Sequence, residues 1–295
     1  MKKITILTST YNRAGTLCKL FESLLSQTIL DFEWIVIDDG STDKTESIIQ
    51  KMIGNNPPFR IRYYYQENGG KHRAINRGLE IASGEYIFFV DSDDYLPKNS
   101  IEIVLKHIAT LISSDKKFIG VSGLKAYPNG TIVGRTFKGN YRDCTDLERY
   151  KHNIIGDKAE VYKLDILKDY RFPEVEGENF ITEAVLWNRI AKEGYYLRHF
   201  NEVIYYCEYL EDGLTKNIDM NFVNNFKGYT MYVTELIEYE LPLKIKIKAV
   251  LAYCYRAKLR KLSIDEVATN INLDKVKIII LTAIACIYKT IRKRK

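Results

Sequence analysis

Residues 86–94 read Tyr-Ile-Phe-Phe-Val-Asp-Ser-Asp-Asp, an apolar run that ends in three carboxylates within four positions. The uninterrupted apolar part is typical of a buried strand. The acids that follow, Asp91, Asp93 and Asp94, repel one another unless something compensates for their charge. A hard divalent cation that bridges diphosphate oxygens would provide this compensation. A polar turn that caps the helix after Pro97 would account for the same residues, so the cluster alone leaves both interpretations open.

Strand-like and helix-like stretches alternate on the N-terminal side of this run. Strands are predicted over residues 4–10, 32–37, 61–65 and 86–90, and helices over residues 14–27, 44–53 and 69–82. This alternation predicts a doubly wound α/β fold with a mostly parallel, Rossmann-like sheet flanked by helices. In such sheets ligands bind at the carboxyl ends of the strands. Three of these ends carry polar residues that we expect to converge: Ser9-Thr10-Tyr11-Asn12, Asp38-Asp39 and Asp91-Ser92-Asp93-Asp94.

Beyond residue 95 the pattern is less regular. A helix is predicted over residues 98–112, strands over 118–125 and 131–137 around the turn Pro128-Asn129-Gly130, a helix over 182–192 and an extended run over 195–206. From residue 241 onward the sequence is helix-like and basic. We therefore predict an α/β domain over residues 1–215, with halves at 1–95 and 96–215, followed by a helical, basic extension over residues 216–295.

Two further motifs are suited to a nucleotide. A carboxylate of Asp38 or Asp39 would accept hydrogen bonds from a base imide or from ribose hydroxyls, although a turn that caps the next helix explains the same acids. Lys71 follows Asn68-Gly69-Gly70 at a predicted helix start, where a cation would lie near a phosphate. A surface lysine in a plain loop is the alternative. The sequence contains neither GxGxxG nor GxxxxGK[ST], which disfavours NAD-type and P-loop chemistry.

These motifs occur together in the order and at the spacing of a known family. The set resembles glycosyltransferase family 2, which has the GT-A fold, over roughly residues 3–95. It consists of five motifs: Ser9 to Arg13; Glu33 to Asp43; Asn68 and Gly70, followed by Asn76 and Gly78; Ala82 to Tyr86; and Asp91 to Asp94. The resemblance implies a nucleoside-diphosphate sugar donor, with a UDP-sugar favoured, a divalent Mn or Mg ion, and inversion at the anomeric carbon.

The resemblance also assigns roles to single residues. It makes residues 1–95 the nucleotide-binding half and residues 96–215 the acceptor half. Asp93 is the expected metal ligand, with Asp91 as the second candidate. Many relatives carry Pro where this chain has Ser9. Seven residues are expected to line the donor nucleotide, with the first two at the base: Ser9, Tyr11, Asp38, Asp39, Lys71, Asp91 and Ser92.

The acceptor half resembles the family more loosely. Relatives place an acidic pair at the start of a helix, usually ending in the Asp that acts as general base, and residues 177–189 match that stretch. The usual Asp position holds Ala184, which leaves Glu183 as the expected base and Glu178 as the reserve. A base must reach the acceptor hydroxyl within hydrogen-bond distance and contributes roughly 10²–10⁴-fold in rate. Capping of its own helix is the alternative role for Glu183.

Two other features of the acceptor half have open roles. Trp187 belongs either to the core or to a platform for a sugar ring. His199 lies in the extended run and the loop over residues 208–213 follows it, and both would either close over the site or belong to a solvated loop.

The net charge of +6 is unevenly distributed. Residues 241–295 contain 14 Lys/Arg and 3 Asp/Glu, a net charge of +11, which leaves −5 for residues 1–240. Cations bracket the mostly apolar residues 278–288, a stretch of 11 residues that falls short of the ~20 needed to span a bilayer. We expect an interfacial helix on an anionic membrane, with packing on the catalytic domain or subunit contacts as alternatives. Nucleic acid is not expected as a partner, because no recognised module accompanies the charge.

The cysteines and the N-terminal residues indicate the cellular compartment in which the protein is expected to work. Five widely spaced cysteines without a CxxC pair indicate buried, unpaired thiols in a reducing compartment. The N-terminus lacks the longer apolar core and the cleavage site of a signal peptide. We therefore expect a cytoplasmic enzyme, peripheral on the inner face of the plasma membrane, that adds a sugar to a surface or cell-wall glycan.

Two rival functions remain open. A nucleotidyltransferase also uses a Rossmann-like sheet and metal-binding carboxylates, although it usually has a Gly-rich, basic N-terminal loop that this sequence lacks. A sugar- or nucleotide-binding module that has lost its base is the non-enzymatic alternative, and Ala184 is consistent with it.

Overall fold

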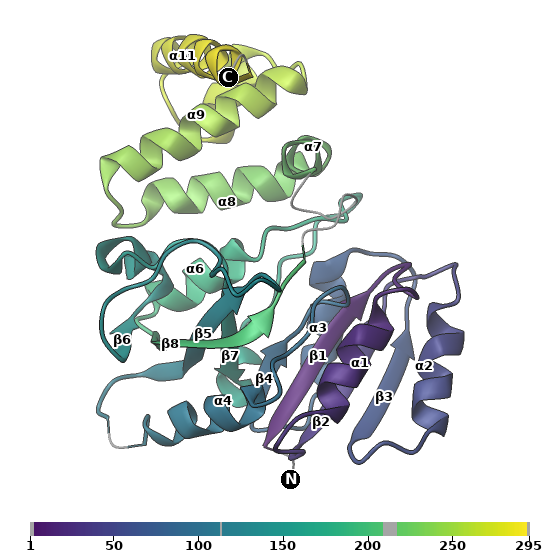
Figure 1. Ribbon diagram of the computed structural model, residues 1–295. Coiled ribbons are helices and arrows are strands. Elements are labelled where there is room, and N and C mark those ends of the chain that lie inside the picture. The colour runs from purple at the N-terminus through teal and green to yellow at the C-terminus, as the bar shows by residue number, and fades with distance from the viewer. Residues whose placement is uncertain (1–2, 113, 209–216, 294–295) are drawn as a thin grey trace. The chain divides into compact units, whose positions relative to one another are not determined.

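The computed structural model describes residues 3–112, 114–208 and 217–293 (Figure 1). The chain forms two compact units. The first comprises Met1–Phe172 with Leu186–Leu210, and the second comprises Pro173–Val185 with Glu211–Lys295. The segment 173–185, which sequence analysis had placed inside the first domain, therefore groups with the C-terminal helices.

A mixed eight-stranded sheet forms the centre of the first unit, in the order β3-β2-β1-β4-β7-β5-β8-β6. Strands β1 to β4 are mutually parallel, and β5 is parallel to β8, whereas β7 is antiparallel to both of its neighbours and β6 is antiparallel to β8. The predicted mostly parallel α/β sheet is confirmed. The strands are β1 Ile4–Thr10, β2 Phe32–Asp38, β3 Arg60–Tyr65, β4 Tyr86–Phe89, β5 Phe118–Ala126, β6 Tyr141–Cys144, β7 Lys158–Lys163 and β8 Tyr196–Tyr206.

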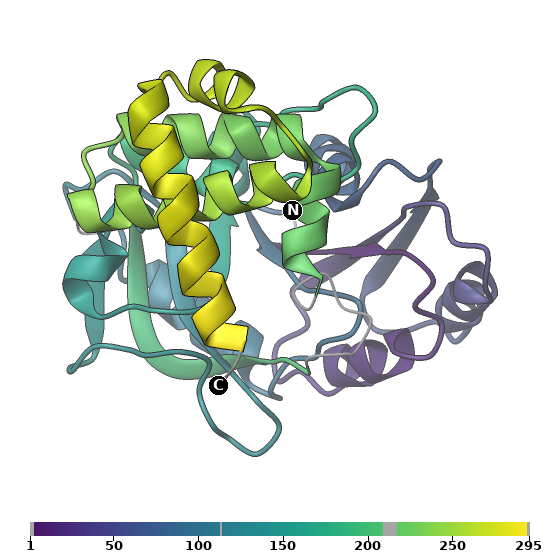
Figure 2. The same ribbon diagram turned by 90° about the horizontal axis from the view of Figure 1, so that it is seen from above.

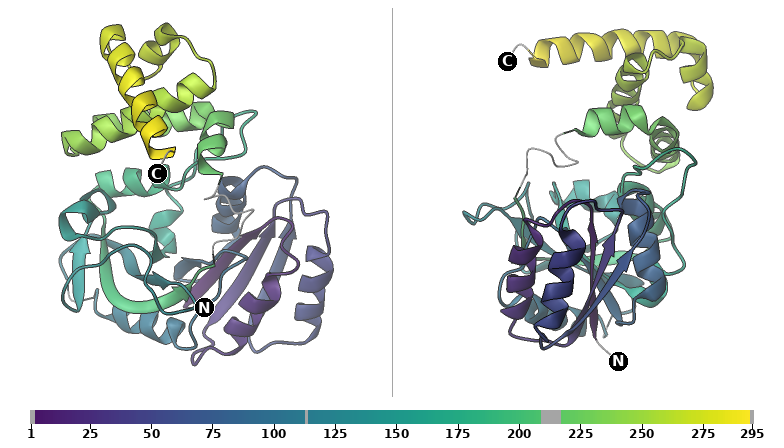
Figure 3. Two further views of the ribbon diagram at one scale, coloured as in Figure 1. Left: turned by 45° about the horizontal axis from the view of Figure 1, so that its top comes forward. Right: turned by 90° about the vertical axis from the view of Figure 1, so that its right-hand side faces the viewer.

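Alternate residues of each strand point to opposite faces of the sheet. Helices cover both of these faces (Figure 3). Ile4 and Ile6 of β1 point into a core shared with α1, α2 and α4. Leu7 points to the other face, where α3 approaches so closely that a Cβ on Gly78 would lie 2.4 Å from the Leu7 side chain. The helices of this unit are α1 Leu17–Leu25, α2 Thr45–Gly54, α3 Lys71–Ile81, α4 Ser100–Ala109, the 3₁₀ helix η1 Asp146–His152, α5 Leu164–Leu167 and most of α6 Ala184–Lys192.

The strand predicted over residues 131–137 is wrong. This stretch makes two isolated bridges, Ala126 with Ile132 and Arg135 with Ile155, instead of a ladder. Its backbone turns at Gly134, where φ is +73° and a Cβ would lie 2.0 Å from the Ile155 carbonyl oxygen. This positive-φ conformation, which favours glycine, interrupts the extended pattern.

Strands β6 and β7 were not predicted. β7 lies in the interior of the sheet although it carries Lys158 and Glu160, which are typical of an exposed segment. The Lys158 side chain is 4% exposed, and its Nζ donates to the carbonyl oxygens of Val133 (3.1 Å) and Ile155 (2.8 Å). Burial lowers the pKa of Lys158 to about 8. Backbone acceptors from neighbouring loops thus make a lysine tolerable inside the sheet.

The second unit is helical, as the basic C-terminal extension was predicted to be. Its helices are α7 Ile218–Asn224, α8 Phe226–Glu238, α9 Leu243–Leu259, α10 Ile264–Asn270 and α11 Lys275–Lys293. They enclose their own core, in which Tyr253 is fully buried and its hydroxyl lies 2.8 Å from that of Thr230. α11 crosses over α9 (Figure 2). Among the described residues, no helix has the length and apolar character required to cross a bilayer.

The five cysteines all lie in the described part of the chain, and none forms a disulfide. Cys144, Cys207 and Cys254 are buried as expected, whereas Cys18 is exposed. Burial raises the pKa of Cys144 to about 12 and that of Cys207 to about 11, so both stay protonated thiols near neutral pH.

Candidate active site

The predicted polar motifs follow neighbouring strands at one edge of the sheet. β1 lies between β2 and β4 and runs parallel to both, with Thr10 opposite Asp38. The Val90 amide donates to the Leu7 carbonyl (3.0 Å) and extends the pairing of β4 to the first acid of the cluster. The carboxyl ends of the three strands therefore lie next to one another, which is where open α/β sheets bind ligands.

Asp38 closes the loop that follows β2. Its Oδ1 accepts a hydrogen bond from the Ser41 amide (2.8 Å), and its Oδ2 accepts one from the Tyr63 hydroxyl (2.8 Å). The side chain is 1% exposed. Burial and the Asp38 carboxylate raise the pKa of Tyr63, so this hydroxyl remains a donor. Both oxygens of Asp38 are thus used inside the protein.

Asp39 anchors the turn that opens α3. Its Oδ1 accepts from Gln66 Nε2 (2.7 Å) and the Gly69 amide (3.0 Å), and its Oδ2 accepts from the Gly70 amide (2.7 Å). Gly40, at φ +88°, lets the two loops meet, since a Cβ there would lie 2.8 Å from the Asn68 nitrogen. A carboxylate offers about four acceptor positions. Three of them are occupied, so roughly one position of Asp39 remains for a donor nucleotide.

Asn12 joins the end of β1 to the loop after β2. It adopts a left-handed conformation, with φ +51°, and its Oδ1 accepts from the amides of Thr42 (2.8 Å) and Asp43 (3.3 Å). Its own amide donates to Ser41 Oγ (2.8 Å). Tyr11, just before it, is 48% exposed, which leaves its ring accessible for stacking on a base. Sequence reasoning included Asn12 in the motif but assigned it no function.

Lys71 reaches from the first turn of α3 to the acidic cluster after β4. Its Nζ lies 2.5 Å from Asp91 Oδ1. Burial opposes ionisation of Asp91, but the positive charges of Lys71 and Lys125 outweigh it and lower the pKa of Asp91 to about 2. Asp91 is therefore a carboxylate throughout the physiological range. The expected position of Lys71 near a phosphate stays a prediction, and its ion pair with Asp91 was not foreseen.

Asp93 differs from its neighbours. Its side chain is half-buried, and burial together with the charge of Asp91 raises its pKa, which Arg13 and Lys71 offset only in part. No other residue in the described ranges donates a hydrogen bond to its carboxylate. Ser92, between the two acids, is buried at 6% exposure. Asp93 is thus an acid with ligand capacity in a place where a cation would be stabilised.

This arrangement fits a divalent metal held jointly by the protein and a diphosphate. The described residues contain no ready group of three or more His, Cys, Asp or Glu side chains that would hold an ion without other ligands. Mg²⁺-type ions usually bind through one or two carboxylates plus phosphate oxygens and water. The carboxylate of Asp93, which accepts no hydrogen bond from any other described residue and is crowded by Asp91, matches that set.

Tyr205 of β8 forms hydrogen bonds with two residues of the acidic cluster, Asp91 and Asp94. The fully buried hydroxyl of Tyr205 accepts from the Asp91 amide (3.0 Å) and donates to Asp94 Oδ2 (2.7 Å). Lys125 Nζ lies 4.3 Å from the centre of the Tyr205 ring. Burial and the charge of Asp91 raise the pKa of Asp94 to about 7. Sequence reasoning missed Tyr205 and Lys125, because their pairing with residues 91–94 depends on contacts between distant strands.

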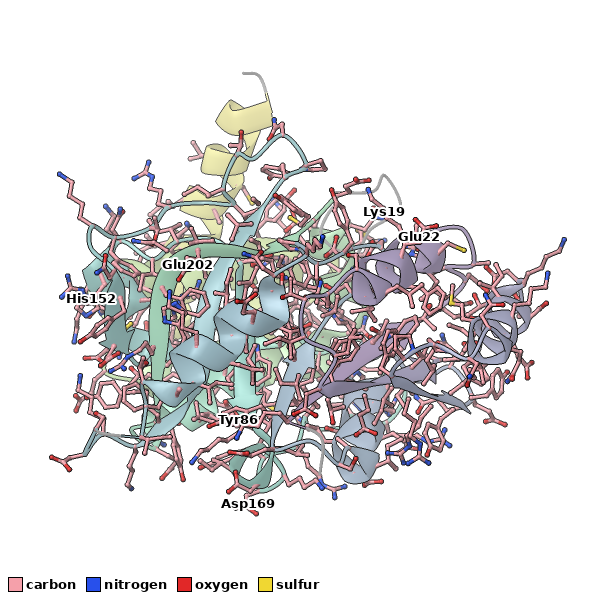
Figure 4. The ribbon with its side chains drawn as sticks, turned by 60° about the horizontal axis from the view of Figure 1, so that its bottom comes forward. Lys19, Glu22, Tyr86, His152, Asp169 and Glu202 are labelled. Atoms are coloured by element: carbon pink, nitrogen blue, oxygen red, sulfur yellow. The ribbon has the colours of Figure 1, made fainter. Side chains whose placement is uncertain are left out.

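A further contact fastens this cluster to α1. The Glu208 amide donates to Asp94 Oδ1 (3.1 Å), and the Glu208 carboxylate forms an ion pair with Lys19. Lys19 projects from α1 beside Glu22 (Figure 4). The cluster after β4 is therefore connected to β8, β5 and α1 at once.

Comparison with known proteins assigns the family. The family model for glycosyl transferase family 2 matches residues 5–170. The chain belongs to glycosyltransferase family 2. The matched residues include all the positions predicted to bind the donor or the metal, from Ser9 to Asp93.

Two individual proteins illustrate the sequence similarity of this glycosyltransferase to its relatives. It is 28% identical over 250 residues to the GalNAc(5)-diNAcBac-PP-undecaprenol beta-1,3-glucosyltransferase of Campylobacter jejuni, covering 82% of this chain and 76% of that protein. It is 41% identical over 134 residues to the chondroitin synthase of Pasteurella multocida, covering 45% of this chain and 14% of the synthase.

Solved structures share the fold of the transferase. S. aureus TarS 1–349 in complex with UDP-GlcNAc matches with a TM-score of 0.63 at 21% identity, over 92% of this chain and 79% of that one. A mannosyltransferase of Pyrobaculum calidifontis, in complex with GDP-Man and Mn²⁺, matches with a TM-score of 0.57 at 17% identity, over 99% of this chain and 82% of that one. The predicted GT-A fold is confirmed.

The two candidate bases of the transferase lie beyond the residues matched by the family model, in the second unit. Glu178 is 7% exposed, and its carboxylate accepts from the amides of Lys227 and Gly228 (2.8 Å each) at the start of α8. This interaction satisfies helix-terminal N–H groups and complements the helix dipole. Glu183 immediately precedes α6 and is half-buried. Its role as base stays a prediction.

The structure of the first unit bears on the residues whose roles the sequence left open, Trp187 and His199. Trp187 stacks on Tyr162, with ring centres 4.5 Å apart and planes 14° apart, and contacts Phe89 and Phe172, which favours the core. His199 lies within β8 at 2% exposure, so it belongs neither to a closing segment nor to a solvated loop. Of the loop predicted over residues 208–213, only Glu208 lies in the described residues.

Proposed function

We propose that this glycosyltransferase moves a sugar from a nucleoside-diphosphate sugar, with UDP as the favoured carrier, to a hydroxyl of a glycan or lipid-linked acceptor, with inversion at the anomeric carbon. The observation that carries the proposal is the state of the acidic cluster after β4. Asp91 is paired with Lys71, whereas the neighbouring Asp93 receives no hydrogen bond from another described residue. A diphosphate with its cation would complete that site.

Donor recognition would divide among the three strand ends. Ser9 and the exposed ring of Tyr11 would line the base, and the remaining acceptor position of Asp39 would take an N–H or O–H from the base or ribose. Asp38 and the buried Ser92 would act through the loops they belong to. Lys71 would share its charge between Asp91 and the diphosphate.

A Mn or Mg ion would be held by Asp93, with Asp91 as the second candidate. When bound, such an ion neutralises the charge of the departing nucleoside diphosphate. Lys71 and Lys125 keep Asp91 ionised, and Tyr205 holds the backbone of Asp91 in place. These residues would fix the cluster before the donor arrives, so that little reorganisation is needed during the reaction.

Glu183 would remove the proton from the acceptor hydroxyl. The oxygen would then attack the anomeric carbon from the face opposite the diphosphate, and the bond between that carbon and the diphosphate oxygen would break. Glu183→Gln should slow transfer by roughly 10²–10⁴-fold with little change in donor affinity. Glu178→Gln should instead lower stability, because the carboxylate of Glu178 accepts two amides of α8. Equal rates for wild type and Glu183→Gln would remove the base assignment.

The names of two relatives and the distribution of charge support the proposed acceptor and location. The C. jejuni relative is named for an undecaprenol-linked substrate, and the P. multocida relative for a polysaccharide product. With the net charge of +11 over residues 241–295, these names support a cytoplasmic enzyme of cell-surface polysaccharide synthesis. It would be peripheral on the inner face of the plasma membrane through its basic C-terminus, without nucleic acid as a partner.

A donor screen tests the proposal. Purified protein is incubated with a panel of UDP-, GDP- and dTDP-sugars, with and without Mn²⁺, and thermal unfolding and release of nucleoside diphosphate are followed. One donor class should raise the unfolding temperature in the presence of Mn²⁺ and be turned over slowly to its diphosphate. Release of pyrophosphate from a nucleoside triphosphate would indicate a nucleotidyltransferase. Donor binding without any turnover or transfer would indicate an inactive module.

A further inference from the structure

α11 presents an apolar face away from its own core. One side of the helix carries Ile278 and Ala285, which are 0% and 3% exposed within the core of the second unit. The opposite side carries large apolar side chains that are 47–62% exposed. We call these residues the α11 face: Val276 (62%), Ile279 (54%), Ile280 (54%), Ile284 (47%) and Ile287 (61%).

Helix geometry makes this face continuous. At 100° per residue the five positions fall within an arc of about 140°, centred opposite the buried positions. Lys275 and Lys277 border the arc on its two sides, and both are exposed. α11 packs on α9 and α10 through its buried side, and it lies on the side of α9 away from α8 (Figures 1 and 2). Exposed apolar surface of this extent and continuity marks an interaction site.

The charge around the α11 face determines the kind of partner. Residues 241–295 carry a net charge of +11. Within this total, α9 carries the exposed Lys244 and Lys248, which alternate with the exposed apolar side chains of Leu243 (71%) and Ile247 (42%). A second copy of the chain would bring the same positive charge to the contact, which opposes association. An anionic lipid surface offers the opposite charge together with an apolar layer.

We propose that the α11 face inserts into the interfacial layer of an anionic membrane, with the helix lying in the membrane plane. The side chains of the face would enter the boundary between headgroups and acyl chains, while the flanking lysines contact anionic headgroups. The inference rests on the proposed use of a membrane-borne acceptor and names the surface that would hold the enzyme there. The buried side of α11 stays in the protein core throughout.

Vesicle binding tests the inference without donor or acceptor. The full chain is sedimented with phosphatidylcholine vesicles that contain one third phosphatidylglycerol, and with vesicles of phosphatidylcholine alone. The wild type should bind the anionic vesicles and bind the neutral ones much more weakly. The double variant Ile280→Gln, Ile287→Gln changes the centre of the α11 face and should bind the anionic vesicles about a hundredfold more weakly.

A matched control changes two exposed isoleucines of the first unit. Ile112→Gln with Ile155→Gln, at positions 86% and 47% exposed, should bind vesicles as the wild type does. Thermal shifts with UDP and Mn²⁺ show that both double variants are folded. Equal vesicle binding by the α11 variant and the wild type, or no binding by either, would overturn the inference. So would wild-type self-association that the α11 variant abolishes while vesicle binding is absent. None of these results bears on the transfer reaction, which is measured separately with detergent-dispersed acceptor.

Discussion

The acids after β2 and the acids after β4 look alike in sequence but differ in structure. Each oxygen of Asp38 and Asp39 accepts at least one hydrogen bond from the protein. After β4, Asp91 is paired with Lys71 and Asp94 with Tyr205, whereas Asp93 receives no hydrogen bond from another described residue. The first motif holds two loops together, and the second contains the carboxylate that we propose binds the cation of the donor.

The difference arises from the donors within reach. Gly40 brings the Asn68-Gly69-Gly70 turn against the loop after β2, so that amides point at Asp39. After β4, burial together with the charge of Asp91 raises the pKa of both Asp93 and Asp94, so the carboxylate form of these two acids is disfavoured. Satisfied acids stabilise a fold, whereas perturbed acids in a ligand-binding position are typical of functional sites.

The largest expected effect follows from changing Asp93, the acid that accepts no hydrogen bond from another residue within the described ranges. Asp93→Asn should lower the transfer rate by about a thousandfold, because a cation-binding carboxylate is worth several kcal/mol in the transition state. The free energy of unfolding should stay the same or rise slightly, since a repelled carboxylate is removed. Initial rates with Mn²⁺ and urea unfolding measure the two quantities. A loss of stability as large as that of an Asp39 variant would assign Asp93 to the loop architecture instead.

Changing Asp39 should have its main effect on stability. Asp39→Ala removes the acceptor for Gln66 and for the amides of Gly69 and Gly70, and should lower the free energy of unfolding by about 3 kcal/mol. Asp169→Ala is the control, because Asp169 is exposed at the edge of the unit (Figure 4). A loss below about 1 kcal/mol, accompanied by weaker UDP binding, would show that Asp39 serves the nucleotide more than the loop.

His199 provides a third case, a buried polar group whose ring nitrogens have no partner among the described residues. Burial and the nearby charge of Arg149 lower its pKa to about 3, against about 6.5 in the unfolded chain. Between these values the unfolded chain binds more protons, so stability falls as the pH drops below about 6.5. His199→Leu should remove about 2 kcal/mol of the loss between pH 7 and pH 5.

The smallest effect is expected from removing the Tyr205 hydroxyl, which forms hydrogen bonds with both Asp91 and Asp94. Tyr205→Phe removes the bond to Asp94 and the acceptor for the Asp91 amide, and should cost about 1–2 kcal/mol of stability. The Mn²⁺ concentration for half-maximal rate should rise several-fold, because the cluster is held less firmly. Tyr141→Phe, at a side chain that is 54% exposed, is the control. An unchanged Mn²⁺ requirement in Tyr205→Phe would mean that β8 does not position the cluster.

The N-terminal half of the fold was predictable because its strands and helices have strong local patterns. β1 and β4 are short apolar runs between turn residues, and the predicted bounds agree with the structure within about one residue. Parallel strands of this kind place their following loops at one edge, so the convergence of the acids also followed from sequence. β7 was not predicted because Lys158 and Glu160 resemble exposed residues, and the burial of Lys158 depends on carbonyl groups of neighbouring loops.

The contacts that prepare the acidic cluster could not be predicted in the same way. Tyr205 lies 111 positions from Asp94 in the chain, and Lys125 comes from yet another strand. Nothing in a single sequence marks such pairs. The segment around Glu178 is a similar case, because Asn225 Oδ1 accepts from the amides of Asn179 and Phe180 and fastens it to the C-terminal helices.

Binding of UDP measured by calorimetry, with and without Mn²⁺, tests the central claim most directly. The claim is that Asp93 is kept for a cation that a diphosphate completes, whereas Asp38 and Asp39 are committed to the loops. In the wild type, Mn²⁺ should strengthen UDP binding at least about tenfold, which corresponds to about 1.4 kcal/mol, and in Asp93→Asn this gain should disappear while binding of UDP alone persists. An equal gain from Mn²⁺ in both proteins would contradict the claim.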